Sequence, residues 1–431
     1  MKKLIFILFA LICIHANAQI DNLSNLSAEW MRTGARNAAT NGTDIAVYNP
    51  AGLTNLEGGL HINLCNQSLF RNPSHSYDLG LGDGIKNFKQ DGSDPFLPSL
   101  YLSFNKNKWA FFGGTYFSGG GATLNYPKGS LTTDLIALQV LQAAGGAYMS
   151  TMDQSMKASS MYLTMIGGAS YSVSKKTSLS ISLRNISATN KTEGGMTLTV
   201  SPFDLPDQPM AIKYEEHANG VGVTLGFNIN CNEKLNIAGR YESAVKLDFK
   251  TEQIQDDFGI TTNGQLNRRD LPAVAAIGMS YRVNNKMKTY LDVNYYFQKK
   301  ADWGTSTMAT NEEPLSSLAG NAYGVGAGIE CAISQTVTAS IGGGFTKFMF
   351  TDKDGYYTHL GTFEVMQDSN GNINTGFRYQ ASKKIKINVG YMHTFWAKDQ
   401  NIKALLAQPL DVNVKVNNSL NAIALGMEVS F

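Results

Sequence analysis

The feature that most limits how this chain can fold is a strict alternation of long and short breaks between strand-like segments. Within the segments, apolar residues alternate with polar or very small ones, as in 178–184, 220–229 and 290–297. Alternation with period two places the two kinds of side chain on opposite faces of a β-strand. A soluble β-sandwich shows the same alternation, so the breaks are needed to separate the two folds.

The short breaks fall at 105–107, 174–176, 230–233, 284–286, 334–335 and 383–384. The long breaks fall at 70–97, 119–157, 201–211, 253–269, 301–318, 351–374 and 398–414. Together they delimit about 14 strands, an even number, with short turns at one end and long loops at the other. The pattern therefore predicts an all-β fold, a transmembrane antiparallel up-and-down β-barrel, with both chain ends on the short-turn, periplasmic side.

The two ends of the chain point to export and membrane assembly. Residues 1–18 have the form of a cleavable signal peptide, with Lys2 and Lys3, an apolar run and Ala16-Asn17-Ala18 as the cleavage site. After it, no apolar stretch approaches the roughly 20 residues of a membrane-spanning helix. The last strand ends in Phe431, which resembles the signal read by the outer-membrane assembly machinery. We expect a multi-pass barrel in the outer membrane of a Gram-negative-type bacterium, in contact with its lipids.

Charge and motifs argue against several other functions. Without Lys2 and Lys3 the net charge falls from +2 to zero, and no basic stripe indicates a nucleic-acid partner. The mature cysteines Cys65, Cys231 and Cys331 are too few and too dispersed for a disulfide framework or a metal site. No nucleophile elbow, zinc motif or phosphate loop occurs, so we expect no enzyme, cofactor or metal, although a Ser/His pair assembled across strands remains a third alternative.

Some residues of the strands invite a closer interpretation. Gly324-x-Gly326-x-Gly328 lies on an alternating strand without a following helix, so it is not a nucleotide loop. Four charged residues are expected to face the lumen, where they would pair or line a wet wall. They are Arg184, Arg240, Lys246 and Asp248. One of the basic residues could hold a carboxylate headgroup, but the sequence does not select which.

Residues 19–57 precede the first strand and do not alternate. They are too rich in Ala, Gly and scattered apolar residues for a solvated tail. Because a barrel of this size has interior space to fill, a plug folded into the lumen is the better interpretation. The predicted organisation is a signal peptide (1–18), a hatch or plug (19–57) and a transmembrane barrel (58–431).

Within this segment, the run 34–53 (GARNAATNGTDIAVYNPAGL) resembles the N-terminal hatch of the FadL/TodX-type outer-membrane transporters of long-chain fatty acids and aromatic hydrocarbons. The triplet Asn49, Pro50 and Ala51 matches the hallmark of that family, and Leu97-Pro98-Ser99-Leu100 is also similar. The outer loops are not closely similar. The resemblance implies that an apolar ligand is captured by the outer loops and meets the hatch inside the barrel. It then leaves sideways, where the third strand kinks inward.

The third strand, roughly 109–118, carries Gly113 and Gly114 and leads into Gly119-Gly120-Gly121. Glycine inside a strand marks a bulge, a bend or a close backbone approach. Gly113 and Gly114 are therefore candidates for a lateral gate, and a merely bent strand end is the alternative.

The longest loop contains a leucine stripe at helical spacing, Leu131, Leu135, Leu138 and Leu141. Thr132 or Thr133 is the expected N-cap, and Gly145-Gly146 would end the helix. The stripe either packs against neighbouring loops or lines a groove that captures an apolar ligand.

The leading hypothesis is a passive outer-membrane transporter of hydrophobic molecules such as long-chain fatty acids, other lipids or hydrocarbons. The alternative is a general diffusion porin or a structural outer-membrane barrel.

Overall fold

The computed structural model describes residues 27–91, 93–305, 313–361, 363–364, 368–396, 400–405 and 411–431. The signal peptide predicted at 1–18 and the first part of the predicted hatch, 19–26, lie outside the described residues.

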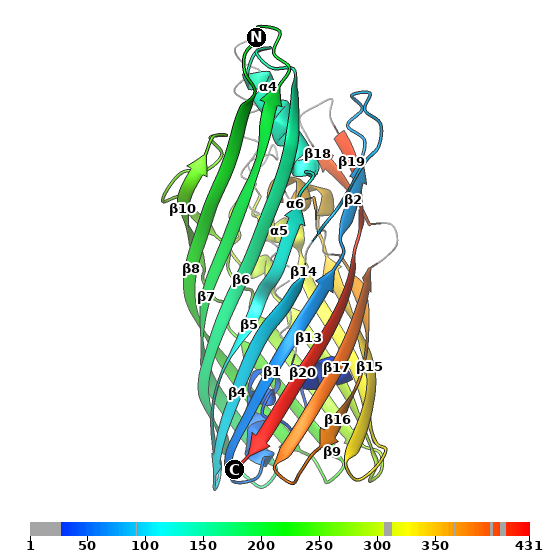
Figure 1. The fold of residues 1–431 in the computed structure, drawn as a ribbon. Coiled ribbons are helices and arrows are strands. Elements are labelled where there is room, and N and C mark those ends of the chain that lie inside the picture. Colours follow the sequence, from blue (N-terminus) through cyan, green and yellow to red (C-terminus); the bar gives the residue numbers. More distant parts are fainter. Residues whose placement is uncertain are drawn as a thin grey trace.

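Fourteen strands of the described chain form a closed antiparallel barrel (Figure 1). In chain order they are β1 (Gly59–Arg71), β4 (Asp94–Lys106), β5 (Trp109–Tyr126), β6 (Ser150–Ser172), β7 (Thr177–Thr199), β8 (Gln208–Asn230), β9 (Leu235–Glu242), β12 (Val274–Arg282), β13 (Met287–Tyr296), β14 (Asn321–Ala332), β15 (Val337–Met349), β16 (Asn370–Gln380), β17 (Ile385–Trp396) and β20 (Ser419–Ser430). Each strand pairs with the next, and β20 closes the ring by pairing with β1. The predicted fold class and strand number are confirmed.

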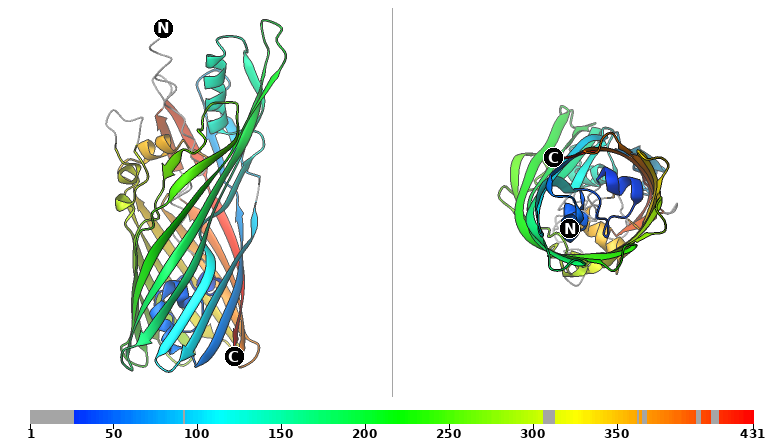
Figure 2. Two further views of the ribbon diagram at one scale, coloured as in Figure 1. Left: turned by 90° about the vertical axis from the view of Figure 1, so that its left-hand side faces the viewer. Right: turned by 90° about the horizontal axis from the view of Figure 1, so that it is seen from below.

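All six predicted short breaks are tight turns at one end of the barrel, which we call the inner end; the long loops define the outer end (Figure 1). The outer boundaries of the strands differ from the prediction. The strands β6, β7 and β8 have 23 residues each and rise above the rest of the barrel (Figure 2). Their outward faces there carry ion-paired side chains such as Lys191 and Glu215, 2.7 Å apart, so the apolar alternation that marked the strands fades. The predicted break 119–157 was therefore too long at both ends.

An apolar belt faces outward around the barrel. On β7, the side chains of Leu179, Ile181 and Leu183 are each at least half exposed, whereas Ser180 and Ser182 between them are buried toward the lumen. A soluble sandwich would bury the apolar face in its core. The outward apolar face and the polar interior are those of a transmembrane barrel.

No helix among the described residues is both long enough and apolar enough to cross a membrane.

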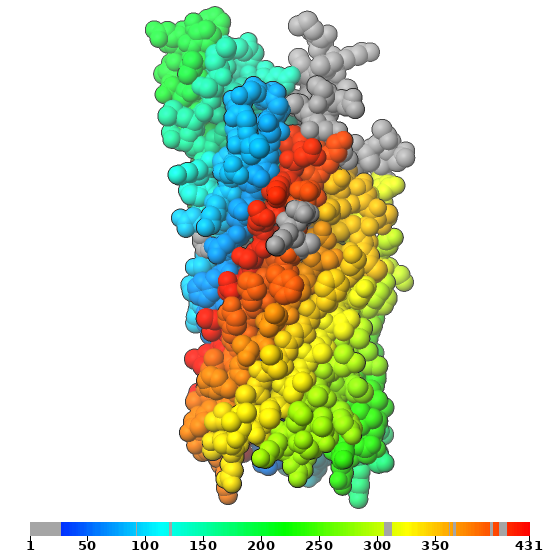
Figure 3. Space-filling model, turned by 90° about the vertical axis from the view of Figure 1, so that its right-hand side faces the viewer, coloured from blue at the N-terminus to red at the C-terminus, as the bar shows by residue number. Residues whose placement is uncertain are grey.

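The outer end is covered by loops that pack into a cap. A four-stranded sheet of β2 (Ser74–Tyr77), β3 (Lys86–Lys89), β18 (Gln400–Leu405) and β19 (Asp411–Asn417) joins the first and last outer loops, which lie side by side in Figure 3. The helical elements of the loops are α4 (Leu131–Ala143), η3 (Gln298–Lys300), α5 (Leu315–Ala319) and α6 (Lys353–Leu360). A large apolar cluster that includes Trp303, Tyr356 and Val414 holds the cap together. Beside it, the hairpin β10 (Asp248–Asp256) and β11 (Leu266–Arg268) continues β9 and β12 outward.

The segment before β1 lies inside the barrel at its inner end (Figures 1 and 2). It consists of α2 (Ala28–Thr33), α3 (Ile45–Tyr48) and the 3₁₀ helix η2 (Pro50–Asn55). Met31, Ile45 and Leu53 of this segment are fully buried. It occupies the lumen, and we call it the hatch.

Candidate functional site

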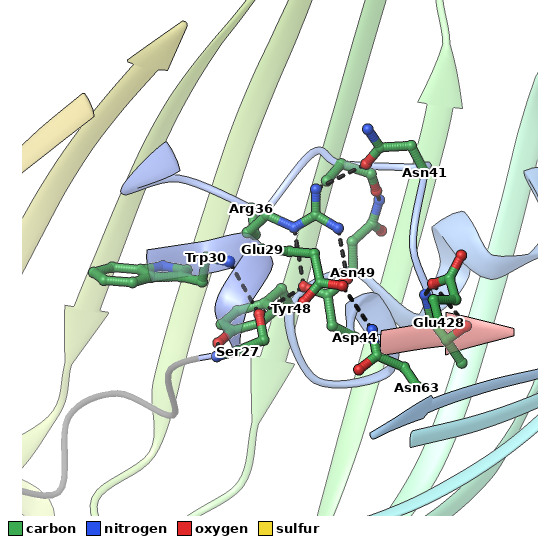
Figure 4. Close-up of polar contacts among 12 residues, drawn as sticks. Ser27, Glu29, Trp30, Arg36, Asn41, Asp44, Tyr48, Asn49, Asn63 and Glu428 are labelled. Atoms are coloured by element: carbon green, nitrogen blue, oxygen red, sulfur yellow. Dashed lines mark hydrogen bonds and ion pairs between the residues drawn. The ribbon is translucent and has the colours of Figure 1, made fainter. Parts of the chain in front are cut away.

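A buried ion pair lies at the centre of the hatch. The guanidinium of Arg36 donates to both carboxylate oxygens of Asp44, at 2.5 and 3.0 Å, and neither side chain is exposed (Figure 4). Ser27 donates a further hydrogen bond to Asp44 at 2.8 Å. Burial alone would lower the pKa of Arg36, but the charge and hydrogen bond of Asp44 raise that pKa above its ordinary value. The pair therefore ties together the two ends of the loop between α2 and α3, and Ser27 joins the start of the hatch to it.

Three strands of the wall hold the hatch in place. Asp292 on β13 accepts hydrogen bonds from the backbone N–H groups of Arg36 and Asn37, at 2.6 and 2.8 Å. Glu428 on β20 accepts from the backbone and the hydroxyl of Thr43, at 2.6 and 3.0 Å. Arg32 of α2 pairs with Glu330 on β14. Charge-assisted hydrogen bonds of this kind are short and strong, so the hatch is fixed to the wall in one orientation.

The Asn49-Pro50-Ala51 triplet forms the joint between the hatch and the opposite wall. The Asn49 amide donates to the carbonyl of Ala39 and to the side chain of Asn228 on β8, at 2.9 and 2.8 Å. Its oxygen accepts from the N–H of Gly52 and so caps η2, where Pro50 is the first residue. The carbonyl of Pro50 accepts from Ser170 on β6 at 2.6 Å. The asparagine and the proline thus connect the hatch to two strands, and Ala51 is fully buried beside them.

Glycines on β14 and β15 leave space for the end of α2, because they carry no side chain. A Cβ atom at Gly328 would lie 2.0 Å from the carbonyl oxygen of Thr33, and one at Gly342 would lie 1.9 Å from the same atom. A Cβ at Gly326 would lie 2.4 Å from the carbonyl oxygen of Gly34. The sequence showed the glycine repeat on β14, but it gave no sign that the repeat is a seat for the hatch, because the contact joins residues about 300 positions apart.

The carboxyl of Glu29 on α2 is buried against β1 and β17. Its Oε1 accepts from Asn63 and Asn388, at 2.6 and 2.9 Å, and its Oε2 has no hydrogen-bond partner among the described residues. Burial, and next the charge of Asp44, raises the pKa of Glu29 from 4.5 to about 7. A proton on Glu29 therefore stabilises the seated hatch.

This shift predicts a pH dependence of hatch seating. Once the hatch leaves its seat, Glu29 ionises near its ordinary pKa of 4.5, whereas the seated carboxyl keeps its proton up to about pH 7. The seated state is therefore most stable below pH 4.5 and loses stability as the pH rises to about 7. Cleavage of the hatch by a protease active over this range should become faster with rising pH. Glu29→Gln should remove that dependence, and the exposed Glu57→Gln should not; equal pH profiles in all three proteins would contradict the assignment.

Above the hatch, the lumen contains a cavity of about 270 Å³. Its floor is formed by Trp30, Asn37 and Tyr48 of the hatch. Its wall combines apolar and charged side chains, among them Leu97, Tyr116, Phe117, Arg184, Arg240, Glu242, Leu271, Asp292 and Phe348. The cavity is therefore closed by the hatch on the inner side.

The charged part of the cavity wall is internally paired. Arg184 pairs with Glu242, and Arg240 binds the same carboxylate at 2.7 Å. Arg240 also donates to Asn37 and to the Tyr48 carbonyl of the hatch, at 2.6 and 3.0 Å. Both arginines face the lumen, as predicted.

The prediction for Lys246 and Asp248 was wrong. Their side chains are 64% and 43% exposed, and they pair with each other at 3.1 Å on the outside. The chain bends between β9 and β10, and there Val245 and Leu247 are fully buried. After the bend, the positions that would continue the inward-facing set of β9 face outward, and the positions between them face inward.

The barrel wall is incompletely paired between β4 and β5. The ladder joins these strands from the inner end up to the pair Leu100 and Thr115. Beyond Thr115, β5 pairs only with β6 and contains two bulges, and residues 94–99 of β4 pair only with β1. At the outer end of the gap, Asp94 accepts hydrogen bonds from the hydroxyl and the N–H of Thr123, at 2.9 and 3.2 Å. We call the segments 94–99 and 116–123 the lateral window.

The window opens onto the cavity. Leu97, Pro98 and Ser99 on one side and Tyr116 and Phe117 on the other all line it. Proline has no N–H, so Pro98 cannot contribute a donor to a restored ladder. The weakly bonded part of the cavity wall therefore lies at the side of the barrel and not at the inner end of the lumen.

The two predicted gate glycines border the window without forming it. Gly113 and Gly114 are still paired with Leu102 and Tyr101 of β4. A Cβ at Gly114 would lie 2.8 Å from the carbonyl oxygen of Leu100, so the strands approach closely there, just before the ladder ends. A gating role for these glycines stays a prediction.

The predicted helix of the longest loop is present as α4, but its N-cap is Ser130 and not Thr132 or Thr133. Ser130 and Thr133 form a reciprocal capping box, which the sequence analysis missed. Leu131 and Leu135 belong to the apolar core of the cap. Leu138 and Leu141 are half-buried and belong to none of the described clusters. The first half of the leucine stripe is therefore packed against other loops, and ligand capture by the stripe stays a prediction.

A closed barrel with a hatch in its lumen and a cavity that reaches a lateral window defines a plugged transmembrane barrel. Known structures share the fold of this chain over nearly its whole length. The crystal structure of a Pseudomonas aeruginosa FadL homologue is similar with a TM-score of 0.67 at 13% identity, covering 94% of this chain and 98% of that one. The Ralstonia pickettii toluene transporter TbuX has a TM-score of 0.61 at 16% identity, with coverage of 95% and 99%. The Pseudomonas putida toluene transporter TodX has a TM-score of 0.63 at 12% identity, with coverage of 96% and 100%.

The sequence itself matches no protein-family model and no curated protein. At these identities the likeness shows the fold, and it confirms the fold that the FadL/TodX resemblance implied.

Proposed function

We propose that this protein is a passive transporter that carries hydrophobic molecules across the outer membrane and releases them sideways through the window between β4 and β5. The observation that carries the proposal is the course of the cavity, which is blocked by the hatch toward the inner end and bordered by unpaired strand segments at its side. Solved structures that share the fold include two toluene transporters, and toluene is a hydrophobic molecule.

The physical basis of the proposal is burial. Each methylene group that leaves water for an apolar site gains about 0.8 kcal/mol. A lateral exit delivers an apolar molecule into the hydrocarbon of the membrane without returning it to water. No energy source is needed, because the molecule moves down its own concentration gradient.

A general diffusion porin is the alternative. It requires an open aqueous path, whereas here the lumen near its inner end holds a hatch bonded to the wall at Asp292, Glu330 and Glu428. Uptake of labelled toluene and labelled fatty acid by proteoliposomes, compared with uptake of a small sugar, separates the two. Passage of the sugar without either hydrophobic molecule would favour the porin.

Filling the window should slow transport. The side chain of Ser99 is 7% exposed and lines the cavity at the window, so Ser99→Trp would place an indole in the opening. We expect uptake of the hydrophobic probe to fall by about tenfold or more, which corresponds to about 1.4 kcal/mol in the barrier. Phe104→Trp, at a side chain that is 47% exposed on the fully paired part of the same strand, is the matched control. Equal uptake by Ser99→Trp and the control would contradict a lateral route through this window.

We propose transport and not catalysis as the role of the barrel. Hydrolysis of an ester by the purified protein, abolished by substitution of a lumenal Ser or His, would contradict this.

A further inference from the structure

Two polar side chains on the wall of the cavity form no hydrogen bond with any other described residue. They are Asn372 on β16 and Trp396 on β17, and both line the cavity above the hatch. The amide oxygen of Asn372 and the indole nitrogen of Trp396 are buried without a partner among the described residues. Buried polar groups are normally satisfied, so an acceptor and a donor that line one cavity point to a ligand that bonds to both.

Arg184 and Asp292 also line the cavity and have one unsatisfied atom each, but both side chains serve the fold. The guanidinium of Arg184 pairs with Glu242. The carboxylate of Asp292 accepts two N–H groups of the hatch. The side chains of Asn372 and Trp396 bond neither to the hatch nor to a neighbouring strand, so their polar atoms contribute no bond to the fold.

Asn372 and Trp396 lie close enough to bind one ligand group together. In the antiparallel pair of β16 and β17, Asn372 is opposite Thr394 and Asn370 is opposite Trp396. Asn372 and Trp396 are therefore diagonal neighbours on the inward face, with Cα atoms roughly 7–8 Å apart. On the other side of Asn372 lies Gly344 of β15, which also lines the cavity and has no side chain to cover the amide.

This side of the cavity is polar but uncharged. The lining residues from β14, β15, β16, β17 and β20 include no charged side chain, whereas the charged ones come from β1, β7, β9 and β13. Taking an ionised group out of water without a counter-charge is costly, and a neutral group avoids that cost. A hydroxyl is neutral and can donate to the oxygen of Asn372 while it accepts from the N–H of Trp396. Phe348 and Met392, which are buried on the same strands, supply apolar surface for the rest of such a molecule.

We propose that Asn372 and Trp396 form a recognition site for a hydroxyl group, so that the cavity selects uncharged amphiphiles with one hydroxyl on an apolar body over hydrocarbons of the same size. The inference rests on the proposed function and narrows its substrate class. The oxygen of Asn372 accepts a hydrogen bond from the hydroxyl, and the N–H of Trp396 donates one to it. The apolar body of the ligand packs against the apolar part of the wall.

The test uses the mature protein in lipid nanodiscs and three probes of equal heavy-atom number: nonanol, its isomer methyl octyl ether, and decane. Binding is measured by displacement of a fluorescent apolar reporter, with protein-free nanodiscs as the blank. Asn372→Leu keeps the approximate shape of the side chain and removes the acceptor. It should weaken binding of the alcohol about fivefold and leave the ether, which has no donor, within about twofold.

Trp396→Phe removes the donor and keeps an aromatic ring. It should weaken binding of the alcohol and the ether alike, because both oxygens accept hydrogen bonds, and it should leave decane within about twofold. Trp109→Phe is the matched control, since it removes the N–H of an indole that is 45% exposed outside the lumen, and it should change the binding of no probe.

The possible outcomes separate the site from its alternatives. Equal weakening of all three probes would show that the residue only shapes the cavity, and unchanged alcohol binding in both variants would show that water alone satisfies the two groups. Loss of alcohol affinity in only one variant would contradict a site that needs both groups. Each of these results overturns the inference and leaves the proposed function standing. If Asn372→Leu does not assemble into a heat-stable barrel, Asn372→Ala takes its place. A wild-type protein that binds none of the probes, decane included, would contradict the proposed function itself.

Discussion

Replacing Arg36 by Met should unseat the hatch while the barrel stays folded. The substitution leaves the carboxylate of Asp44 buried without its cation, and breaking a buried pair in this way costs about 3–5 kcal/mol. The strand ladder does not depend on the pair, because all fourteen strands are bonded to each other around the ring. The substitution should therefore destabilise the hatch and its contacts with β13, β14 and β20.

Planar-bilayer conductance measures this directly. Arg36→Met should show larger and more variable conductance than the wild type, and faster protease cleavage within the hatch, with the same heat-dependent gel mobility of the barrel. The double variant Arg36→Met/Asp44→Leu removes the uncompensated charge as well and should recover part of the wild-type behaviour. A single variant as closed and as protease-resistant as the wild type would show that the pair does not hold the hatch.

Adding one methyl group to the glycine seat should also displace the hatch. In Gly328→Ala the new Cβ would lie 2.0 Å from the carbonyl oxygen of Thr33, which is backbone and cannot rotate away. The strand β14 is paired on both sides, with β13 and β15, so α2 has to move. Overpacking of this kind costs about 1–3 kcal/mol.

The expected result for Gly328→Ala is a raised conductance and a weaker response of hatch cleavage to pH, because Glu29 on the same helix leaves its buried site. Gly167→Ala is the matched control, since a Cβ there would meet no atom within 4 Å. If the two alanine variants conduct alike, the close approach of Gly328 to Thr33 is not what seats the hatch.

Local patterns in the sequence were sufficient for the barrel. The period-two alternation is a property of each strand taken alone, and the six short turns were all found from it. The same reasoning failed where the alternation is altered. It missed the outer ends of β5 and β6, whose outward faces turn polar above the membrane belt. It also predicted that Lys246 and Asp248 face the lumen, whereas the bend after β9 turns them outward.

The hatch was only partly predictable. Its composition and the Asn49-Pro50-Ala51 triplet indicated a plug, but nothing in the sequence pointed to its partners. Arg36 meets Asp292, and Thr33 meets Gly328 and Gly342, across separations of more than 250 positions. A single sequence contains no pattern that predicts such contacts, because the two partners lie in different elements and follow no common spacing.

The lateral window illustrates the same division. The glycines of the third strand suggested where its ladder would be weak, and the ladder does end at Thr115, next to Gly114. The sequence by itself determined the strands, the turns and the presence of a segment unsuited to solvent, because these follow from the spacing of residues along the chain. Closure of the ring was needed to decide which strands face the cavity and where the hatch is bonded. Those properties depend on side chains that only the closed barrel brings together.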